Sequence, residues 1–323
     1  MEFPVLGPLQ VLDAGRPVTI AAPRQRALLA ALLVNANEVV STDRLLDLVW
    51  GEDQPDVGAL RYQVSKLRDA LQPDRESGQD GVLVTQAPGY VLRVTTGQVD
   101  ALAFEALVEE ARLAHAADSA QALKLLDEAL ALWRGPAYTD FAYEEFARLE
   151  ILRLEERRLE ATEDRFDALL ALGREREVIG ELQALVDEHP HRERLTGALM
   201  LALYRSGRQA EALAAYQTLR RELGEGLGIE PSKELADLEN RILLQDESLA
   251  VEAAPPAAEF LRGYILRGRI GEGAHGIVWR AAQPGVGREV AIKAIHPDIA
   301  NRPGFVRRFE MEAQLVASLE HPH

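Results

Sequence analysis

A repeat in the middle of the chain constrains the fold more than any other feature of the sequence. The stretches "LGREREVIGELQALV" and "SGRQAEALAAYQTLR" align with Gly173 over Gly207 and Leu185 over Leu219, at an offset of 34 residues. Around them, from residue 99 to about 245, alanine and leucine recur at helical spacing among many glutamates and arginines. A fixed period of this length predicts stacked helix pairs, with each glycine in the turn between two helices and Leu185 buried.

Composition sets the limits for the rest of the 323-residue chain. It contains no cysteine and no apolar stretch of the roughly 18 residues that a membrane span needs, and it begins without a signal-like segment. We therefore expect a cytoplasmic protein with no metal site and no membrane partner. The net charge of −16 divides into −3 for residues 1–96, −14 for 97–250 and +1 for 251–323. Contact with nucleic acid would therefore require a local basic surface.

The first hundred residues alternate between strands and helices. "FPVLGPLQVLDAGRPVTI" predicts a short antiparallel sheet, and "PRQRALLAALLVNAN" and "STDRLLDLVWGE" predict two helices, the second capped by Ser41 or Thr42. A third helix is expected in "DVGALRYQVSKLRDAL", whose apolar stripe leaves a polar, partly basic outer face. "VLVTQAPGYVLRV" then predicts a hairpin turning at Pro88 and Gly89. This order of elements predicts a winged helix-turn-helix domain over residues 1–96.

The same stretches closely resemble the DNA-binding domain of the bacterial antibiotic regulatory proteins (SARP-type), relatives of the OmpR-type winged helix. The resemblance implies that the third helix enters the major groove of promoter DNA while the hairpin reaches the backbone or the adjacent minor groove. The residues it implies for DNA binding are Arg61, Tyr62, Ser65, Lys66, Arg68 and Arg93, with Thr85 near the wing. The alternative is that these residues are only the solvated face of an amphipathic helix. The acidic Asp69 lies on the same face, which differs from the purely basic surface expected for DNA contact. Trp50 and Tyr90 are expected to pack in the core.

Residues 97–247 resemble the bacterial transcriptional activator domain that follows the winged helix in those regulators. The stretches that carry this resemblance include "LALWRGPAYTDF" and "ELGEGLGIEPSKELADLENRIL". It implies a tetratricopeptide-like scaffold for homodimer formation, intramolecular regulation or contact with the transcription machinery. A simple spacer is the alternative, because charge runs such as "RLEERRLEATED" are usually solvated faces.

A proline-containing linker at 248–260 precedes a change of character in residues 261–323. "YILRGRIGEGAHGIVWRAAQPGVGREVAIKAI" predicts three strands with a glycine-rich turn, and resembles the start of the N-lobe of a bacterial Ser/Thr protein kinase, an antiparallel sheet plus a helix. The resemblance implies an ATP site in which glycines cover the phosphates and Lys293 pairs with them. The residues it implies are Ile270, Gly271, Gly273, Gly276, Val278, Ala291, Lys293 and Glu312. An exposed strand lysine is the alternative for Lys293, and Glu310 could take the place of Glu312.

No HRD-like or DFG sequence occurs in the 323 residues, so the aspartates that would hold Mg²⁺ and accept the substrate proton are missing. We name no catalytic residue and expect no kinase activity from this chain alone. ATP would bind weakly, or only in a longer chain, and Mg²⁺ only with the missing lobe.

The sequence thus predicts a multi-domain, mainly helical protein: winged helix, helical repeats and a partial kinase lobe. Its expected function is that of a DNA-binding transcriptional regulator. Two alternatives remain at this stage. One is a Ser/Thr kinase, complete only in a longer chain, with a regulatory N-terminus. The other is an interaction scaffold whose winged helix contacts protein instead of DNA.

Overall fold

A computed structural model describes residues 1–51, 56–72, 81–249, 265–273, 276–283 and 288–295. The chain divides into two compact units, Met1–Ala250 and Val251–His323, and each is described here by itself. Among the described residues, no helix is long and apolar enough to cross a membrane.

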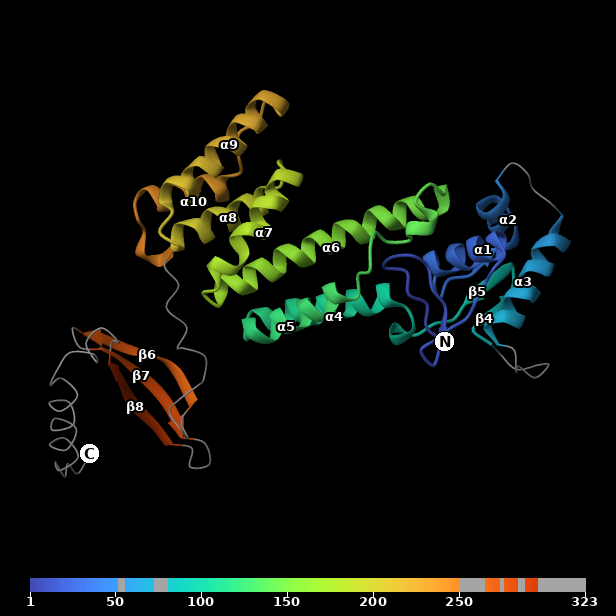
Figure 1. The fold of residues 1–323 in the computed structure, drawn as a ribbon, viewed down its shortest axis with the longest axis horizontal. Coiled ribbons are helices and arrows are strands. Elements are labelled where there is room, and N and C mark those ends of the chain that lie inside the picture. The colour runs from blue at the N-terminus through green and yellow to red at the C-terminus, as the bar shows by residue number, and fades with distance from the viewer. Residues whose placement is uncertain (52–55, 73–80, 250–264, 274–275, 284–287, 296–323) are drawn as a thin grey trace. The chain divides into compact units, whose positions relative to one another are not determined.

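The first unit begins with the predicted winged helix (Figure 1). Its elements are β1 (Leu12–Asp13), β2 (Arg16–Pro17), α1 (Pro23–Val34), β3 (Val40–Ser41), α2 (Thr42–Trp50), α3 (Val57–Leu71), β4 (Leu83–Gln86) and β5 (Gly89–Leu92). The three helices and the final hairpin match the expected order. Sequence analysis missed β3, a two-residue strand that pairs antiparallel with β5 and gives the sheet order β3-β5-β4.

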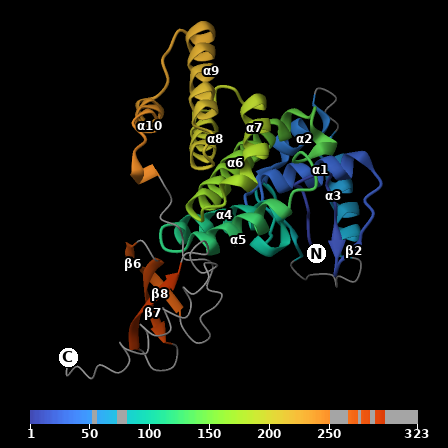
Figure 2. The same cartoon turned by 60° about the vertical axis from the view of Figure 1, so that its left-hand side comes forward.

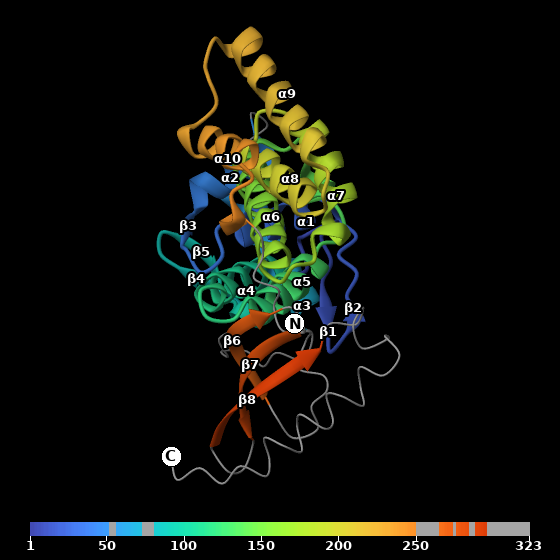
Figure 3. The same cartoon turned by 90° about the vertical axis from the view of Figure 1, so that its left-hand side faces the viewer.

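Helices make up most of the rest of this unit. They are α4 (Asp100–His115), α5 (Ser119–Ala131), α6 (Glu145–Ala171), α7 (Glu175–Glu188), α8 (Glu193–Arg205), α9 (Gln209–Leu227) and α10 (Lys233–Leu243). Short 3₁₀ turns lie at Thr96–Gln98, Thr139–Phe141 and Glu247–Leu249. Helices α8 and α9 run side by side, as Figures 2 and 3 show from two directions.

The predicted equivalence of Gly173 and Gly207 is confirmed. Gly173 lies between α6 and α7 with φ 70°, and Gly207 lies between α8 and α9 with φ 78°, a left-handed conformation that favours glycine. The residues that follow also match, because Arg174 donates to Glu177 at 2.8 Å and Arg208 donates to Glu211 at 2.7 Å. Leu185 is only half-buried, however, whereas its counterpart Leu219 is buried, so the prediction of full burial at Leu185 is wrong.

Two apolar cores fill this unit, and neither ends at the predicted domain boundary near residue 96. The first core extends from Phe3 to Ala161, so that the winged helix and helices α4 and α5 pack as one body with the first part of α6. The second core includes Leu123 of α5, and its other residues lie between Phe166 and Leu249. The change from one core to the other falls within α6, between Ala161 and Phe166.

The described part of the second unit is an antiparallel sheet in the order β6-β7-β8, as predicted from its sequence. Its strands are β6 (Ile265–Gly273), β7 (Gly276–Gln283) and β8 (Arg288–Ile295). The helix expected after them, with Glu312, lies outside the described residues.

Candidate nucleic-acid interface

Helix α3 is held in place by its apolar stripe and its N-terminal cap. Asp56 caps the helix by accepting a hydrogen bond from the Ala59 amide at 3.0 Å. The stripe consists of Leu60, Val64, Leu67 and Leu71, each at most 1% exposed. Since α3 packs against α1 and α2 through this stripe, its opposite face is turned to solvent.

That exposed face, here called the α3 surface, consists of Arg61, Tyr62, Ser65 and Lys66. Tyr62 is 59% exposed, and the Lys66 ammonium lies 5.9 Å from the centre of its ring. Lys66 also lies 3.6 Å from the Asp69 carboxylate, an exposed pair that water screens strongly. Within the part of the chain that the structure describes, Arg61 makes no ion pair. The structure therefore brings four of the six predicted DNA-binding residues together, with the arginine available to a ligand.

The other two predicted residues lie at the wing, the hairpin of β4 and β5. Arg93 follows β5 and is exposed, with a nitrogen 3.4 Å from the Gln86 side-chain oxygen. Arg68 is half-buried and contacts β4 instead of projecting from the α3 surface. Its Nε donates to the Leu83 carbonyl at 2.9 Å, and a terminal nitrogen donates to the Thr85 hydroxyl at 2.8 Å. Arg68 therefore links α3 to the wing.

The base of the wing is set by a close backbone approach at Gly89. A Cβ atom added there would lie 1.9 Å from the Val40 carbonyl oxygen, so only glycine permits β5 to pair with β3. Tyr90 and Trp50 are 7% and 8% exposed, and their expected core positions are confirmed. The wing is thus joined to the start of α2 through β3.

The described residues predicted for ATP binding lie in the second sheet. Gly271 pairs with Val278, and Val278 pairs with Lys293, so the three positions form one row across β6, β7 and β8. Ala291 pairs with Arg280, Ile270 and Gly273 lie in β6, and Gly276 lies in β7, where it pairs with Gly273. Glu312 lies outside the described residues.

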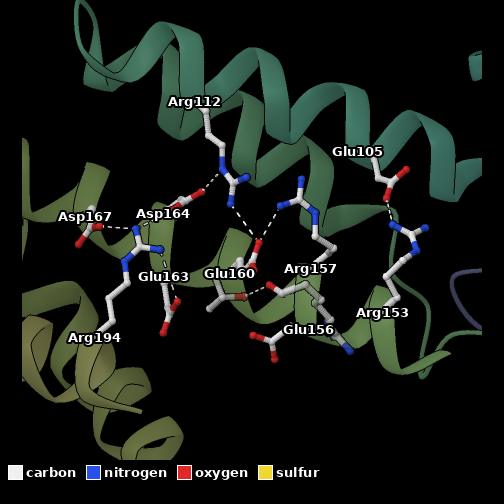
Figure 4. A network of polar contacts seen from close by, with 12 residues as sticks. Glu105, Arg112, Arg153, Glu156, Arg157, Glu160, Glu163, Asp164, Asp167 and Arg194 are labelled. Carbon is white, nitrogen blue, oxygen red and sulfur yellow. Dashed lines mark hydrogen bonds and ion pairs between the residues drawn. The ribbon is translucent and has the colours of Figure 1, made fainter. Parts of the chain in front are cut away.

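Sequence analysis missed an ion-pair network along α6, shown in Figure 4. We call it the α6 network; it consists of Glu105, Arg112, Glu150, Arg153, Glu156, Arg157, Glu160, Glu163, Asp164, Asp167, Arg192 and Arg194. Its arginines come from α4, from α6 itself and from the N-terminal end of α8. The helical spacing of acidic residues on α6 was visible in the sequence, but their partners lie on other helices.

The centre of the α6 network is Glu163, which is 3% exposed. It accepts hydrogen bonds from Arg192 at 2.8 and 3.2 Å, and an Arg194 nitrogen lies 3.4 Å away. Next to it, Asp164 accepts from Arg112 at 2.9 Å and from Arg194 at 2.5 Å. Burial raises the pKa of Asp164, but the hydrogen bonds from Arg112 and Arg194 outweigh burial and hold that pKa below its usual range. Glu163 and Asp164 lie where α6 passes from one apolar core to the other.

Comparison with known proteins agrees with the domain order of the first unit. Residues 15–92 match the family "Transcriptional regulatory protein, C terminal", and residues 99–243 match the "Bacterial transcriptional activator domain". Both matches fall on elements described above, the winged helix and helices α4 to α10.

Individual relatives are regulatory proteins. The chain is 36% identical over 260 residues to the transcriptional regulator RedD of Streptomyces coelicolor, covering 79% of this chain and 73% of RedD. It is 43% identical to the regulatory protein AfsR of Streptomyces griseus, covering 80% of this chain but only 26% of AfsR, so it matches about a quarter of that protein's length. The chain belongs to the SARP-type transcriptional regulators.

A solved structure extends the likeness to the fold. "Mycobacterium tuberculosis EmbR in complex with low affinity phosphopeptide" matches with a TM-score of 0.71 and 29% identity, and covers 91% of this chain and 93% of that one. The mainly helical fold with an N-terminal winged helix is therefore an EmbR-like fold.

Proposed function

We propose that this regulator binds promoter DNA sequence-specifically, with α3 in the major groove and the wing at the backbone or the adjacent minor groove. The observation that carries the proposal is the α3 surface, where Arg61 and Lys66 are exposed on one face of a capped helix beside the wing. Arginine in this position suits bidentate contact with a guanine edge, whereas lysine suits a phosphate. Acting on promoter DNA, the protein works in the bacterial cytoplasm.

The test starts by selecting duplexes that the full chain retains from a random library, because the operator is unknown. Binding of the selected duplex is then measured by fluorescence anisotropy for the parent chain and for Arg61→Ala. We expect the variant to lose about 1 to 3 kcal/mol of binding free energy and to discriminate less at one base position. Arg148→Ala, at an exposed arginine of α6, is the matched control and should bind like the parent. Equal binding by Arg61→Ala and the parent would refute the proposed role of Arg61.

We further propose that helices α4 to α10 form a tetratricopeptide-like scaffold for protein contact, by homodimer formation or with the transcription machinery. The equivalent turns at Gly173 and Gly207 support the repeat. The acidic surplus of residues 97–250 favours a protein partner over DNA for this part, because like charge repels phosphate. Analytical ultracentrifugation of the chain with and without selected duplex would show whether the partner is a second copy.

A second candidate function concerns the sheet β6-β7-β8, for which we propose ATP binding in the manner of a kinase N-lobe. The row Gly271, Val278 and Lys293 supports this, because it places the first glycine of the glycine-rich stretch in register with the strand lysine. Titration with a fluorescent ATP analogue and Mg²⁺ should show weak binding that Lys293→Met reduces. Binding unaffected by this change would contradict the assignment of Lys293.

A further inference from the structure

Arg68 differs from the other basic residues of α3 in what its guanidinium contacts. It donates hydrogen bonds to the Leu83 carbonyl at 2.9 Å and to the Thr85 hydroxyl at 2.8 Å, both on β4. The guanidinium carbon also lies 5.8 Å from the centre of the Tyr90 ring, on β5. One side chain of α3 therefore contacts both strands of the wing.

We propose that Arg68 is a positioning residue for DNA binding, which fixes the wing relative to α3 instead of contacting DNA itself. The inference rests on the proposed DNA-binding function. A guanidinium is a rigid planar fork with several donors, so two bonds to one strand determine an orientation that a single flexible ammonium cannot.

The contacts of Arg68 close a ring of elements around the base of the wing. Arg68 joins α3 to β4, β4 pairs with β5, and β5 pairs with β3, which leads directly into α2. The Thr42 amide at the start of α2 donates to the Pro88 carbonyl at 3.2 Å, which ties the wing turn to the same helix. The α3 surface and the wing are thus held in one frame before DNA arrives.

Such a frame matters because α3 and the wing must fit one duplex at the same time. If Arg68 turned toward a phosphate, both of its bonds to β4 would break, and the Leu83 carbonyl and Thr85 hydroxyl would lose their donor. Preorganisation of the two elements lowers the entropy lost on binding and favours the duplex whose shape fits both.

The first arm of the test separates positioning from phosphate contact by salt dependence. Each phosphate contact removed flattens the plot of log K against log salt by about one unit. Arg68→Ala should weaken binding of the selected duplex about tenfold at an unchanged slope, because the wing must then be ordered when DNA binds. Lys66→Ala is the comparison, since it should flatten the slope. Binding to an unselected duplex should stay the same in Arg68→Ala.

The second arm measures the frame directly, without DNA. Because the chain has no cysteine, Ser65→Cys on α3 and Gln86→Cys on the wing allow two spin labels to be placed specifically. Electron–electron double resonance should give a narrow distance distribution in this labelled chain and a broad one after Arg68→Ala. Arg68→Lys should give a distribution of intermediate width. Thr85→Val removes only one acceptor and should broaden the distribution less. Thermal denaturation shows whether Arg68→Ala folds, and Thr85→Val replaces it in the test if it does not.

The outcomes are distinct. Weaker specific binding at unchanged slope, with a broadened distance distribution, supports the proposal. A slope flattened by about one unit with a narrow distribution would show that Arg68 contacts phosphate, and unchanged binding would show that it has no role; either overturns the proposal. If the parent chain selects no duplex, the proposed DNA binding itself fails, while the distance measurement still decides whether Arg68 holds the wing.

Discussion

The arginines of the α3 surface and of the α6 network have the same chemistry but opposite surroundings. In the α6 network, Arg192 and Arg194 share the buried Glu163 and reach further carboxylates on α6. On the α3 surface, Arg61 is exposed and has no ion pair among the described residues. The comparison shows that the number of arginines says little about DNA binding. What matters is which of them have already been neutralised within the fold.

The difference also assigns different roles to the two regions. An arginine held by carboxylates stabilises the contact between helices and offers little charge to a phosphate. An arginine left in water contributes little to folding but is available to a ligand. Changes in the α6 network should therefore affect stability, and changes on the α3 surface should affect binding. The predictions below test this separation in order of expected effect.

The largest effect is expected at Glu163. Glu163→Ala removes the carboxylate between Arg192 and Arg194 and should lower the free energy of unfolding by about 3 kcal/mol, the low end for breaking a buried ion pair. Urea denaturation at pH 7 measures this, with the exposed Glu188→Ala as control. The salt dependence of DNA binding should not change. A variant as stable as the Glu188→Ala control would show that the ion pairs of Glu163 do not stabilise the fold.

A smaller loss of stability is expected at the base of the wing, which is held by backbone pairing. Gly89→Ala would drive a methyl group against the Val40 carbonyl, so the strands must separate, at a cost of about 1 to 3 kcal/mol. Gly97→Ala, where an added Cβ meets nothing within 4 Å, is the control. Thermal denaturation should show a lower melting temperature for Gly89→Ala but not for Gly97→Ala. DNA binding should be weakened in Gly89→Ala only. Full DNA binding by this variant would argue against any role of the wing.

Much of the first unit could be predicted from the sequence, because helical periodicity and turn residues act locally. The stripe of α3, the Ser41 cap of α2 and the turns at Gly173 and Gly207 all follow from neighbouring residues. The three strands of the second unit were also predicted from local pattern.

Features that depend on distant contacts could not be read in this way. The two-residue strand β3 exists only because β5 lies beside it. Arg68 looks like any basic residue of α3 until its bonds to β4 are known, and the acidic residues of α6 look solvated until the arginines of α4 and α8 are placed. Leu185 follows the repeat in sequence, yet it is less buried than Leu219, because burial also depends on which helices cover each position.

The smallest effect expected on stability is a pH dependence of opposite sign in two regions. The pKa of Asp164 is lower in the folded than in the unfolded chain. Its ionised form therefore stabilises the fold at a pH above the ordinary pKa of an aspartate, and this stability is lost as the pH falls through the folded-state pKa. Burial raises the pKa of Asp100, against the hydrogen bonds it accepts from Val5 and Leu6, so its contribution is present at low pH and is lost as pH rises.

Urea denaturation between pH 3 and pH 7 distinguishes the two carboxylates. Relative to the parent chain, Asp164→Asn should make stability rise less with pH, and Asp100→Asn should make it rise more. The same sign of change in both variants would contradict the assignment of one of them to a network of arginines and the other to a desolvated site.

The salt dependence of DNA binding tests the central claim most directly. Anisotropy titrations of the selected duplex at several salt concentrations should give a slope that Lys66→Ala flattens by about one unit, while Lys124→Ala, at an exposed lysine of α5, leaves it unchanged. The double variant Arg61→Ala, Lys66→Ala should lose sequence preference as well. If this double variant bound the selected duplex with the affinity and slope of the parent chain, the α3 surface would not be the DNA-binding surface.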